Sequence, residues 1–380
     1  MRIVSSSVSA RRRWSLLTLG VTLAFALAAC RGPEPAASPR AAAPAPAAVP
    51  GAAAPEPAAA PKPITHRPKV GLGGGAAPEF AWAVLIAEGL GYFAQEGIEV
   101  DGYILGSGAV LNQGFIAGDM EFLLTGLSEV ANNRLAGVPA KAVMAFSDKP
   151  LFSLVVRNEL KDQVKSVTDL RGKTLGFTAP GSLAWFAARL WLSKAGLDPD
   201  NDLQFTPIGA DAAVIYQSLQ SGRIDAFPAW EPVASRLLAE GVAFRLIDSA
   251  NTDHTKQWFG VDPWQDTPLM VRESLIKDKP ELVGGFVKAS MRGSEWVRSH
   301  SAQEIVDAML KNPKGTEVYG SLPRDILLEV ATSVKAKQGT GCFQRQSAEG
   351  IISQAAQFQV IRGPVSFEDY ADTTWSGVCR

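Results

Sequence analysis

The sequence predicts an α/β protein whose globular part is divided into two similar lobes. From residue 69 onward, short apolar runs alternate with longer stretches of helical spacing, and part of this pattern recurs about 104 residues later. Alternating strands and helices are typical of a largely parallel sheet that carries helices on its faces. With 380 residues, 46% of them hydrophobic, the chain is long enough to bury more than one core.

Apolar runs bounded by turn residues mark the expected strands. The first, residues 69–73, leads into the triplet Gly73-Gly74-Gly75. The other expected strands occupy residues 98–105, 121–125, 141–146, 151–157, 173–178, 203–208, 226–229, 242–247 and 269–272. Helices are expected between them, for example over residues 184–195 and 212–221, and from residue 280 onward the pattern is mostly helical.

The recurring pattern indicates two copies of one local plan. Residues 111–138 align without a gap over residues 215–242, so that Gly118 meets Gly222. The identity between the copies is low, which leaves coincidence as the alternative. Two lobes with a shared arrangement of strands and helices are the simpler interpretation.

This repeat sets the expected lobe boundaries. Lobe I comprises residues 69–155 and 270–380, and lobe II comprises residues 156–269. The chain therefore crosses between the lobes twice, through strands 151–157 and 267–272. We expect a cleft between the lobes that closes over a ligand, as in hinged binding proteins.

The N-terminal segment has the features of a bacterial secretion signal. Four arginines precede residue 14, an apolar run covers residues 14–29, and the sequence Leu27-Ala28-Ala29-Cys30 ends it. This ending is typical of a lipoprotein, in which Cys30 is acylated; an ordinary cleaved signal is the alternative. Residues 30–68 are rich in Pro and Ala and are expected to form an extended tether. We expect lipid anchoring in the periplasm or on the outer face of the cytoplasmic membrane.

Two further cysteines, Cys342 and Cys379, are left once Cys30 is assigned to the anchor. In an oxidising compartment, two remaining cysteines predict one disulfide bond. Two buried thiols are the alternative.

Ligands of open α/β sheets bind beyond the carboxyl ends of the strands, where loops lead into helices. Four such junctions, at residues 74–82, 126–128, 179–185 and 230–232, are expected to face the cleft. The candidate ligand-binding residues at or beside these junctions are Pro78, Glu79, Phe80, Trp82, Ser107, Gly126, Leu127, Ser128, Thr178, Gly181, Ser182, Trp185, Trp230 and Glu231. The glycines could instead serve only as turns, the serines as helix caps, and the tryptophans as core residues.

Other function classes have little support in the composition. The net charge is −1 with scattered Lys and Arg, which argues against a nucleic-acid partner. The chain has three histidines, and no metalloprotease, serine-hydrolase or P-loop motif is present. Residues 71–76 fit a dinucleotide-binding fingerprint imperfectly, and no cofactor or metal is expected. A hydrolase that uses paired carboxylates stays open.

Several motifs resemble periplasmic binding proteins for sulfonates, taurine, nitrate and thiamine pyrimidine precursors. These motifs are Ala87-Glu88-Gly89-Leu90-Gly91-Tyr92-Phe93, Glu96-Gly97-Ile98-Glu99-Val100, Ala117-Gly118-Asp119-Met120-Glu121-Phe122, Leu170-Arg171-Gly172-Lys173-Thr174-Leu175-Gly176, Gly222-Arg223-Ile224-Asp225-Ala226 and Trp230-Glu231-Pro232. The resemblance implies a type II periplasmic-binding-protein fold, a monomer without catalytic activity, and an ATP-driven (ABC) importer with its membrane permease as partner.

The sequence also departs from that family. Residues 179–183 read Ala-Pro-Gly-Ser-Leu where relatives often carry a Ser/Thr-rich loop. No arginine lies in the four junctions, whereas Glu79, Glu129 and Glu231 do, so a sulfonate or nitrate site would depend on helix N-termini alone. The related pyrimidine-synthesising enzymes carry a Cys-rich motif that this chain lacks. A ligand-sensing ectodomain for a membrane sensor is the other alternative.

Overall fold

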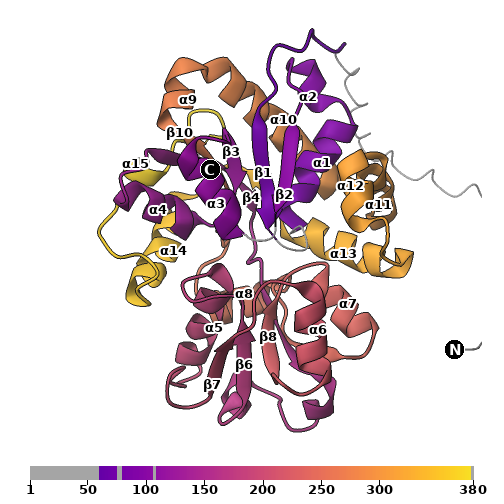
Figure 1. Ribbon diagram of the computed structural model, residues 1–380, viewed down its shortest axis with the longest axis vertical. Coiled ribbons are helices and arrows are strands. Elements are labelled where there is room, and N and C mark those ends of the chain that lie inside the picture. The colour runs from indigo at the N-terminus through magenta and orange to yellow at the C-terminus, as the bar shows by residue number, and fades with distance from the viewer. Residues whose placement is uncertain (1–59, 75–78, 106–107, 378–380) are drawn as a thin grey trace, which may run out of the picture. The chain divides into compact units, whose positions relative to one another are not determined.

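The computed structural model describes residues 60–74, 79–105 and 108–377 (Figure 1). The predicted signal peptide, most of the predicted tether, and Cys30, Pro78, Ser107 and Cys379 lie outside these residues. The last tether residues already pair with the folded part, since the Lys62 N–H donates to the Ala94 carbonyl at 3.0 Å and His66 forms a β-bridge with Ile98. The folded part therefore begins before residue 69.

Lobe I contains a six-stranded sheet in the order β11-β4-β10-β3-β1-β2. Its strands are β1 (Lys69–Gly74), β2 (Asp101–Leu105), β3 (Phe122–Leu124), β4 (Ala140–Ser147), β10 (Pro268–Arg272) and β11 (Gln338–Gly341). Strand β1 pairs in parallel with β2 and β3, whereas β10 runs antiparallel to both β3 and β4. The sheet is therefore mixed rather than largely parallel.

Lobe II contains a five-stranded sheet in the order β7-β6-β8-β5-β9. Its strands are β5 (Ser153–Arg157), β6 (Thr174–Phe177), β7 (Gln204–Pro207), β8 (Ala226–Ala229) and β9 (Ala243–Ile247). Strand β5 is antiparallel to β8 and β9, while β6 is parallel to β7 and β8. The strand that runs antiparallel to both of its neighbours is β10 in lobe I and β5 in lobe II. Each of these two strands is the first after the chain crosses from the other lobe.

The two sheets repeat one plan, as the sequence predicted. The order β4-β10-β3-β1-β2 in lobe I corresponds to β9-β5-β8-β6-β7 in lobe II. The helices correspond as well: α1 (Trp82–Gly89), α3 (Gly108–Ala117) and α4 (Leu127–Leu135) match α5 (Leu183–Lys194), α6 (Ala212–Gln220) and α7 (Val233–Ala239). The exact lobe boundaries, which fall in the crossing segments, stay a prediction.

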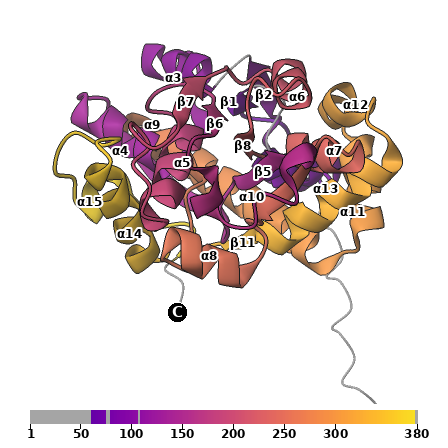
Figure 2. The same ribbon diagram turned by 90° about the horizontal axis from the view of Figure 1, so that it is seen from below.

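The remaining helices complete both lobes. They are η1 (Glu79–Ala81), α2 (Tyr92–Gln95), η2 (Asn158–Leu160), η3 (Val167–Leu170), α8 (Thr252–Phe259), α9 (Glu273–Asp278), α10 (Pro280–Ser299), α11 (Ala302–Lys311), α12 (Pro313–Tyr319), α13 (Arg324–Lys337), α14 (Arg345–Gln357) and α15 (Phe367–Tyr370). Figures 1 and 2 place α14 and α15 on one side of lobe I and α11 to α13 on the other. None of the described helices is both long and apolar enough to cross a bilayer.

Aromatic side chains hold each lobe together. In lobe I the rings of Phe122 and Phe286 stack with centroids 4.2 Å apart, which fixes α10 against the sheet. In lobe II the ring of Trp191 on α5 meets Phe259 on α8 edge-on at 5.7 Å. Such pairs add to the free energy gained by burying their apolar area. These cores hold the strand ends between which the site lies.

Candidate functional site

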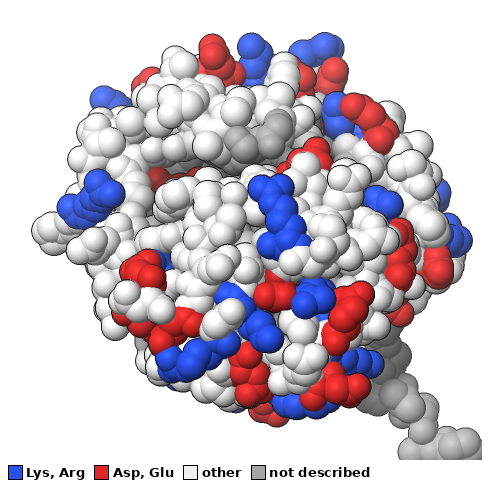
Figure 3. Space-filling view, turned by 60° about the horizontal axis from the view of Figure 1, so that its bottom comes forward, with Lys and Arg blue, Asp and Glu red and all other residues white. Residues whose placement is uncertain are grey.

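A cavity of about 410 Å³ lies between the lobes and is walled by both of them. This volume is in the range of pockets that bind small organic molecules. Its described lining residues are Gly73, Phe80, Gly108, Ala109, Leu124, Thr125, Gly126, Glu129, Leu151, Phe152, Thr178, Ala179, Pro180, Gly181, Ser182, Leu183, Ala184, Gly209, Ala210 and Trp230. Figure 3 shows a hollow on the surface that is bordered mainly by uncharged side chains.

The cavity walls come from the carboxyl ends of parallel strands and the helices that follow them. Lobe I contributes the end of β1, Phe80 in η1, the start of α3 and the junction between β3 and α4. Lobe II contributes the junctions between β6 and α5, between β7 and α6, and after β8. Because both lobes share one plan, equivalent junctions meet across the cavity.

Six of the sequence-predicted residues line the cavity. They are Phe80, Gly126, Thr178, Gly181, Ser182 and Trp230. Each of the four predicted junctions therefore contributes at least one lining residue. Pro78 and Ser107 lie outside the described residues.

The other six predicted residues do not line the cavity. Trp82 is fully buried in lobe I, where its ring meets Tyr319 edge-on at 5.3 Å. Trp185 is partly exposed and lies under the Arg189 guanidinium at 4.8 Å. Leu127 and Ser128 are buried in the first turn of α4. The structure thus corrects the expected role of Trp82 and Trp185, because the side chains of those helices point elsewhere.

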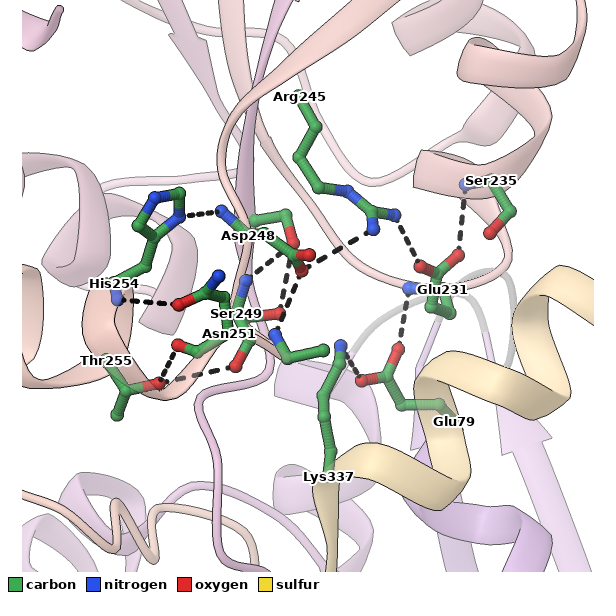
Figure 4. Close-up of polar contacts among 12 residues, drawn as sticks. Glu79, Glu231, Ser235, Arg245, Asp248, Ser249, Asn251, His254, Thr255 and Lys337 are labelled. Atoms are coloured by element: carbon green, nitrogen blue, oxygen red, sulfur yellow. Dashed lines mark hydrogen bonds and ion pairs between the residues drawn. The ribbon is translucent and has the colours of Figure 1, made fainter.

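Glu79 and Glu231, the last two, belong to a buried polar chain that joins the lobes (Figure 4). The carboxylate of Glu79 in lobe I accepts a hydrogen bond of 2.7 Å from the Glu231 backbone N–H in lobe II. It also forms an ion pair with the Lys337 ammonium at the end of α13. All three residues are at most 5% exposed. Glu79 therefore links the two lobes directly beside the cavity.

The series of buried polar contacts continues into lobe II through the Glu231 side chain. One carboxylate oxygen of Glu231 accepts the Ser235 N–H at 3.0 Å, and the other pairs with the Arg245 guanidinium at 2.8 Å. The same guanidinium lies 3.5 Å from Asp248. Burial raises the pKa of Glu79 to about 7, with Lys337 opposing that rise. Protonation of Glu79 therefore falls in a physiological range.

Sequence reasoning did not select several lining residues. Phe152 lies in a crossing segment, where nothing in the local pattern marks a site, and Gly209 and Ala210 follow the short strand β7. Glu129 was noted only as an acidic residue. Its place three residues after Gly126 is the reciprocal position of a helix capping box, which could have identified it.

Glu129 is the one ionisable side chain among the described lining residues. Its Oε2 accepts hydrogen bonds from the Gly126 N–H at 3.2 Å and from the Thr125 hydroxyl. Burial raises the pKa of this carboxyl. The cavity therefore has an acidic group and no basic one among the described residues.

One backbone donor at each of the three helix N-termini beside the cavity is already engaged. At α4 the Leu127 N–H donates to the Asp266 carbonyl at 3.0 Å. At α5 the Trp185 N–H donates to the Ser182 hydroxyl at 3.2 Å, and at α6 the Val214 N–H donates to the Asp211 carboxylate at 2.9 Å. These donors are satisfied by the chain itself, so they offer little to an anion.

Gly126 lies close against the other lobe. A Cβ at this position would be 2.7 Å from Cδ1 of Leu183, which belongs to α5 of the other lobe. Gly126 has a φ of −84°, so a side chain causes no backbone strain and only this contact matters. Glycine here permits close approach of the lobes.

Gly126→Ser is therefore expected to hold the lobes apart at a cost of about 1–3 kcal/mol for the closed arrangement. Serine is a favourable N-cap, so α4 itself is not weakened. Small-angle scattering should show a larger radius of gyration than for the parent. Adding Leu183→Ala should restore the radius of gyration of the parent. If the radius of gyration of Gly126→Ser equals that of the parent, the serine does not hold the lobes apart and the prediction is wrong.

Comparison with known proteins identifies the family. Residues 79–304 match the family described as NMT1/THI5 like. The chain belongs to the NMT1/THI5-like family. This confirms the resemblance to the binding proteins for sulfonates, nitrate and thiamine precursors.

Two proteins with similar sequences are named as binding proteins. YtlA of Bacillus subtilis is 26% identical over 231 residues, which are 59% of this chain and 64% of YtlA, slightly under two thirds of its length. The riboflavin-binding protein RibY of Chloroflexus aurantiacus is 27% identical over 287 residues, which are 73% of this chain and 72% of RibY.

Solved structures share the fold. The alkanesulfonate-binding protein SsuA of Xanthomonas axonopodis, bound to MOPS, superposes with a TM-score of 0.61 at 16% identity, covering 83% of this chain and 100% of SsuA. The two-lobe α/β architecture predicted from the sequence is thereby confirmed as a periplasmic-binding-protein fold. At this identity the similarity concerns the fold alone.

Proposed function

We propose that this NMT1/THI5-like protein is the extracytoplasmic solute-binding component of an ABC importer. It captures a small organic molecule in the cavity between its lobes and delivers it to a membrane permease. The observation that supports this most is a cavity of ligand size walled by both lobes, beside which the Glu79 carboxylate accepts the Glu231 N–H of the other lobe. Family membership and the relatives named as binding proteins agree with it.

Binding would be coupled to lobe closure. A ligand shifts the equilibrium between open and closed arrangements only through contacts that it makes in the closed one. Here Phe80 and Gly126 belong to lobe I, and Ser182 and Trp230 belong to lobe II, so a ligand in the cavity contacts both. The permease would recognise the closed form and release the ligand by reopening it.

The cellular arrangement completes the proposal. Acylation at Cys30 would anchor the protein, the Pro- and Ala-rich segment after it would act as a spacer, and the protein would work as a monomer in the periplasm or on the outer face of the cytoplasmic membrane. A Cys342–Cys379 disulfide would close the C-terminal end of lobe I. Mass spectrometry of the protein from its natural host, before and after reduction, tests both modifications.

Trp230 is expected to contribute to ligand binding, whereas Trp185 is not. Trp230 lines the cavity and is held between Phe152, at 6.0 Å, and Phe227, at 6.2 Å between ring centroids. Trp230→Leu should weaken ligand binding about tenfold or more, because an aromatic anchor in a desolvated pocket is lost. Trp185→Leu, on the neighbouring junction, is the matched control and should bind like the parent.

Riboflavin is the first ligand to test, since RibY is named for it and the uncharged flavin ring suits a cavity without basic residues. Fluorescence titration measures its affinity for the parent and both variants. Native mass spectrometry of the purified protein detects a different co-purified ligand. If neither riboflavin nor any co-purified molecule binds, or if Trp185→Leu loses binding and Trp230→Leu does not, the proposed site is wrong.

Transport is tested separately from binding. Deletion of the gene for the partner permease in the host should abolish uptake of the ligand that these measurements identify. Intact uptake would instead favour a sensor ectodomain.

A further inference from the structure

The charge in the cavity limits the chemistry of its ligand. Glu129 is the one ionisable group among the described lining residues, which are otherwise Gly, Ala, Pro, Leu, Phe, Trp, Ser and Thr. Residues 75–78 and 106–107, which the structure does not describe, contain no basic residue in the sequence.

The carboxylate of Glu129 has one oxygen in use and one available. Both of its donors, the Gly126 N–H and the Thr125 hydroxyl, reach Oε2. Oε1 has no hydrogen-bond partner among the described residues, and the side chain is partly exposed where it lines the cavity. A ligand that fills the cavity removes the water that solvates Oε1, so the ligand itself must supply a donor.

The rest of the wall favours a ring. Phe80 from lobe I and Phe152 and Trp230 from the side of lobe II present aromatic surface to the cavity. Aromatic walls with a few fixed polar groups are typical of sites for flat organic molecules. An anion in the cavity would be repelled by the Glu129 carboxylate, and no described lining residue carries a positive charge to offset that repulsion.

We infer that the cavity binds a ring-containing organic molecule that directs an N–H donor, cationic or neutral, at Oε1 of Glu129, and that it excludes organic anions such as sulfonates and carboxylates. This inference rests on the proposed function, because it assumes that the cavity is the ligand site. It separates this chain from relatives named for sulfonate or nitrate.

Three isosteric probes test the inference on the full chain. Benzamidine is a cation with N–H donors, benzamide is neutral with N–H donors, and benzoate is an anion of nearly the same shape. Calorimetry or ligand-observed NMR at millimolar concentration should rank their affinities as benzamidine first, benzamide second and benzoate last. Benzamidine should exceed benzoate by about tenfold or more, since one charge-assisted hydrogen bond is at stake.

Glu129→Gln is the decisive variant. Glutamine at this position can still accept the Gly126 N–H through its single carbonyl oxygen, so the start of α4 is preserved. The affinity for benzamidine should fall about tenfold or more, because the uncharged amide NH2 that replaces Oε1 is a donor and cannot accept the amidinium N–H. Benzamide should lose less, because its own carbonyl oxygen can turn to accept from that NH2. Asp211→Asn, which caps α6 beside the cavity without lining it, removes the same charge and should leave the ranking unchanged.

The outcomes separate the two proposals. Tighter binding of benzoate than of benzamidine, or equal loss of benzamidine binding in the Glu129 and Asp211 variants, overturns the inference while leaving a ligand site in the cavity. If none of the probes, nor riboflavin, binds to the parent protein, both the inference and the proposed function are wrong.

Discussion

Lys337→Met is expected to lower the free energy of unfolding by about 3–5 kcal/mol at pH 8, the largest single effect that we foresee. Lys337 is 3% exposed, and its ammonium pairs with the Glu79 carboxylate and lies 3.3 Å from the Leu151 carbonyl. Removing the ammonium leaves a buried carboxylate without a counter-charge, and the cost of that desolvated charge determines the size of the effect.

The effect of this substitution should depend on pH in a specific way. At pH 5 Glu79 is protonated in the folded variant and carries no uncompensated charge, so the loss of stability should be smaller than at pH 8. Urea unfolding followed by circular dichroism measures both values. Lys335→Met, two residues away on the exposed face of α13, is the control and should change the stability by no more than about 0.5 kcal/mol.

A double variant isolates the pair itself. Glu79→Gln leaves Lys337 buried and unpaired, so it should also destabilise the protein. Glu79→Gln combined with Lys337→Met removes both charges, and the loss should be clearly smaller than the sum of the two single losses. Additive losses would show that the two side chains do not interact in solution.

The second large effect is a decrease in stability as the pH rises from about 4.5 to about 7. The pKa of Glu79 is raised from 4.5 in the unfolded chain to about 7 in the folded protein. Between these values the folded protein keeps a proton that the unfolded chain has lost, so unfolding releases a proton and becomes easier as pH rises. The contribution is complete below pH 4.5, is lost above about pH 7, and amounts to roughly 3 kcal/mol.

The charged groups that face Glu79 set this value. Burial raises the pKa most, Lys337 lowers it, and Glu231 raises it further. Burial likewise raises the pKa of Asp266 to about 7, so Asp266 adds to the same trend. The measurement is the difference between the parent and Glu79→Gln in urea unfolding from pH 5 to pH 8. If that difference does not vary with pH, Glu79 stays ionised throughout and the expectation is wrong.

The link between Glu79 and Glu231 also connects pH with the lobes. The Glu79 carboxylate accepts the Glu231 N–H across the lobe boundary, and either a charged or a neutral carboxyl group can accept it. The charged form accepts it more strongly. The hydrogen bond from the Glu231 N–H to Glu79 is therefore kept over the whole pH range and strengthens as Glu79 ionises. The free-energy cost of burying the Glu79 charge rises at the same time.

The secondary structure could largely be predicted because it depends on local patterns. The expected strands 69–73, 141–146 and 226–229 coincide within one residue with β1, β4 and β8, since alternating apolar residues and flanking glycines specify strands locally. The strand β11 was missed. Its four residues, Gln338–Gly341, carry no apolar pattern and form a strand only by pairing with β4.

The candidate site could be predicted only as a set of junctions. A junction between a strand and a helix identifies the region of the cleft, but the direction of each side chain depends on how its helix packs. Trp82 and Trp230 both lie at strand-to-helix junctions in the sequence, yet Trp82 packs on Tyr319 in the core whereas Trp230 lines the cavity. Local sequence does not encode that difference.

The sequence by itself determined the α/β class, the two repeated lobes and the four junctions, because periodicity, turn residues and internal similarity are properties of neighbouring positions. Only the tertiary structure decided that Glu79 meets Lys337, that β5 and β10 run antiparallel to their neighbours, and that Glu129 is the charge inside the cavity. Glu79 and Lys337 are 258 residues apart in the chain. Contacts of this kind depend on how segments far apart in the chain fold together, and no local pattern of residues records that packing.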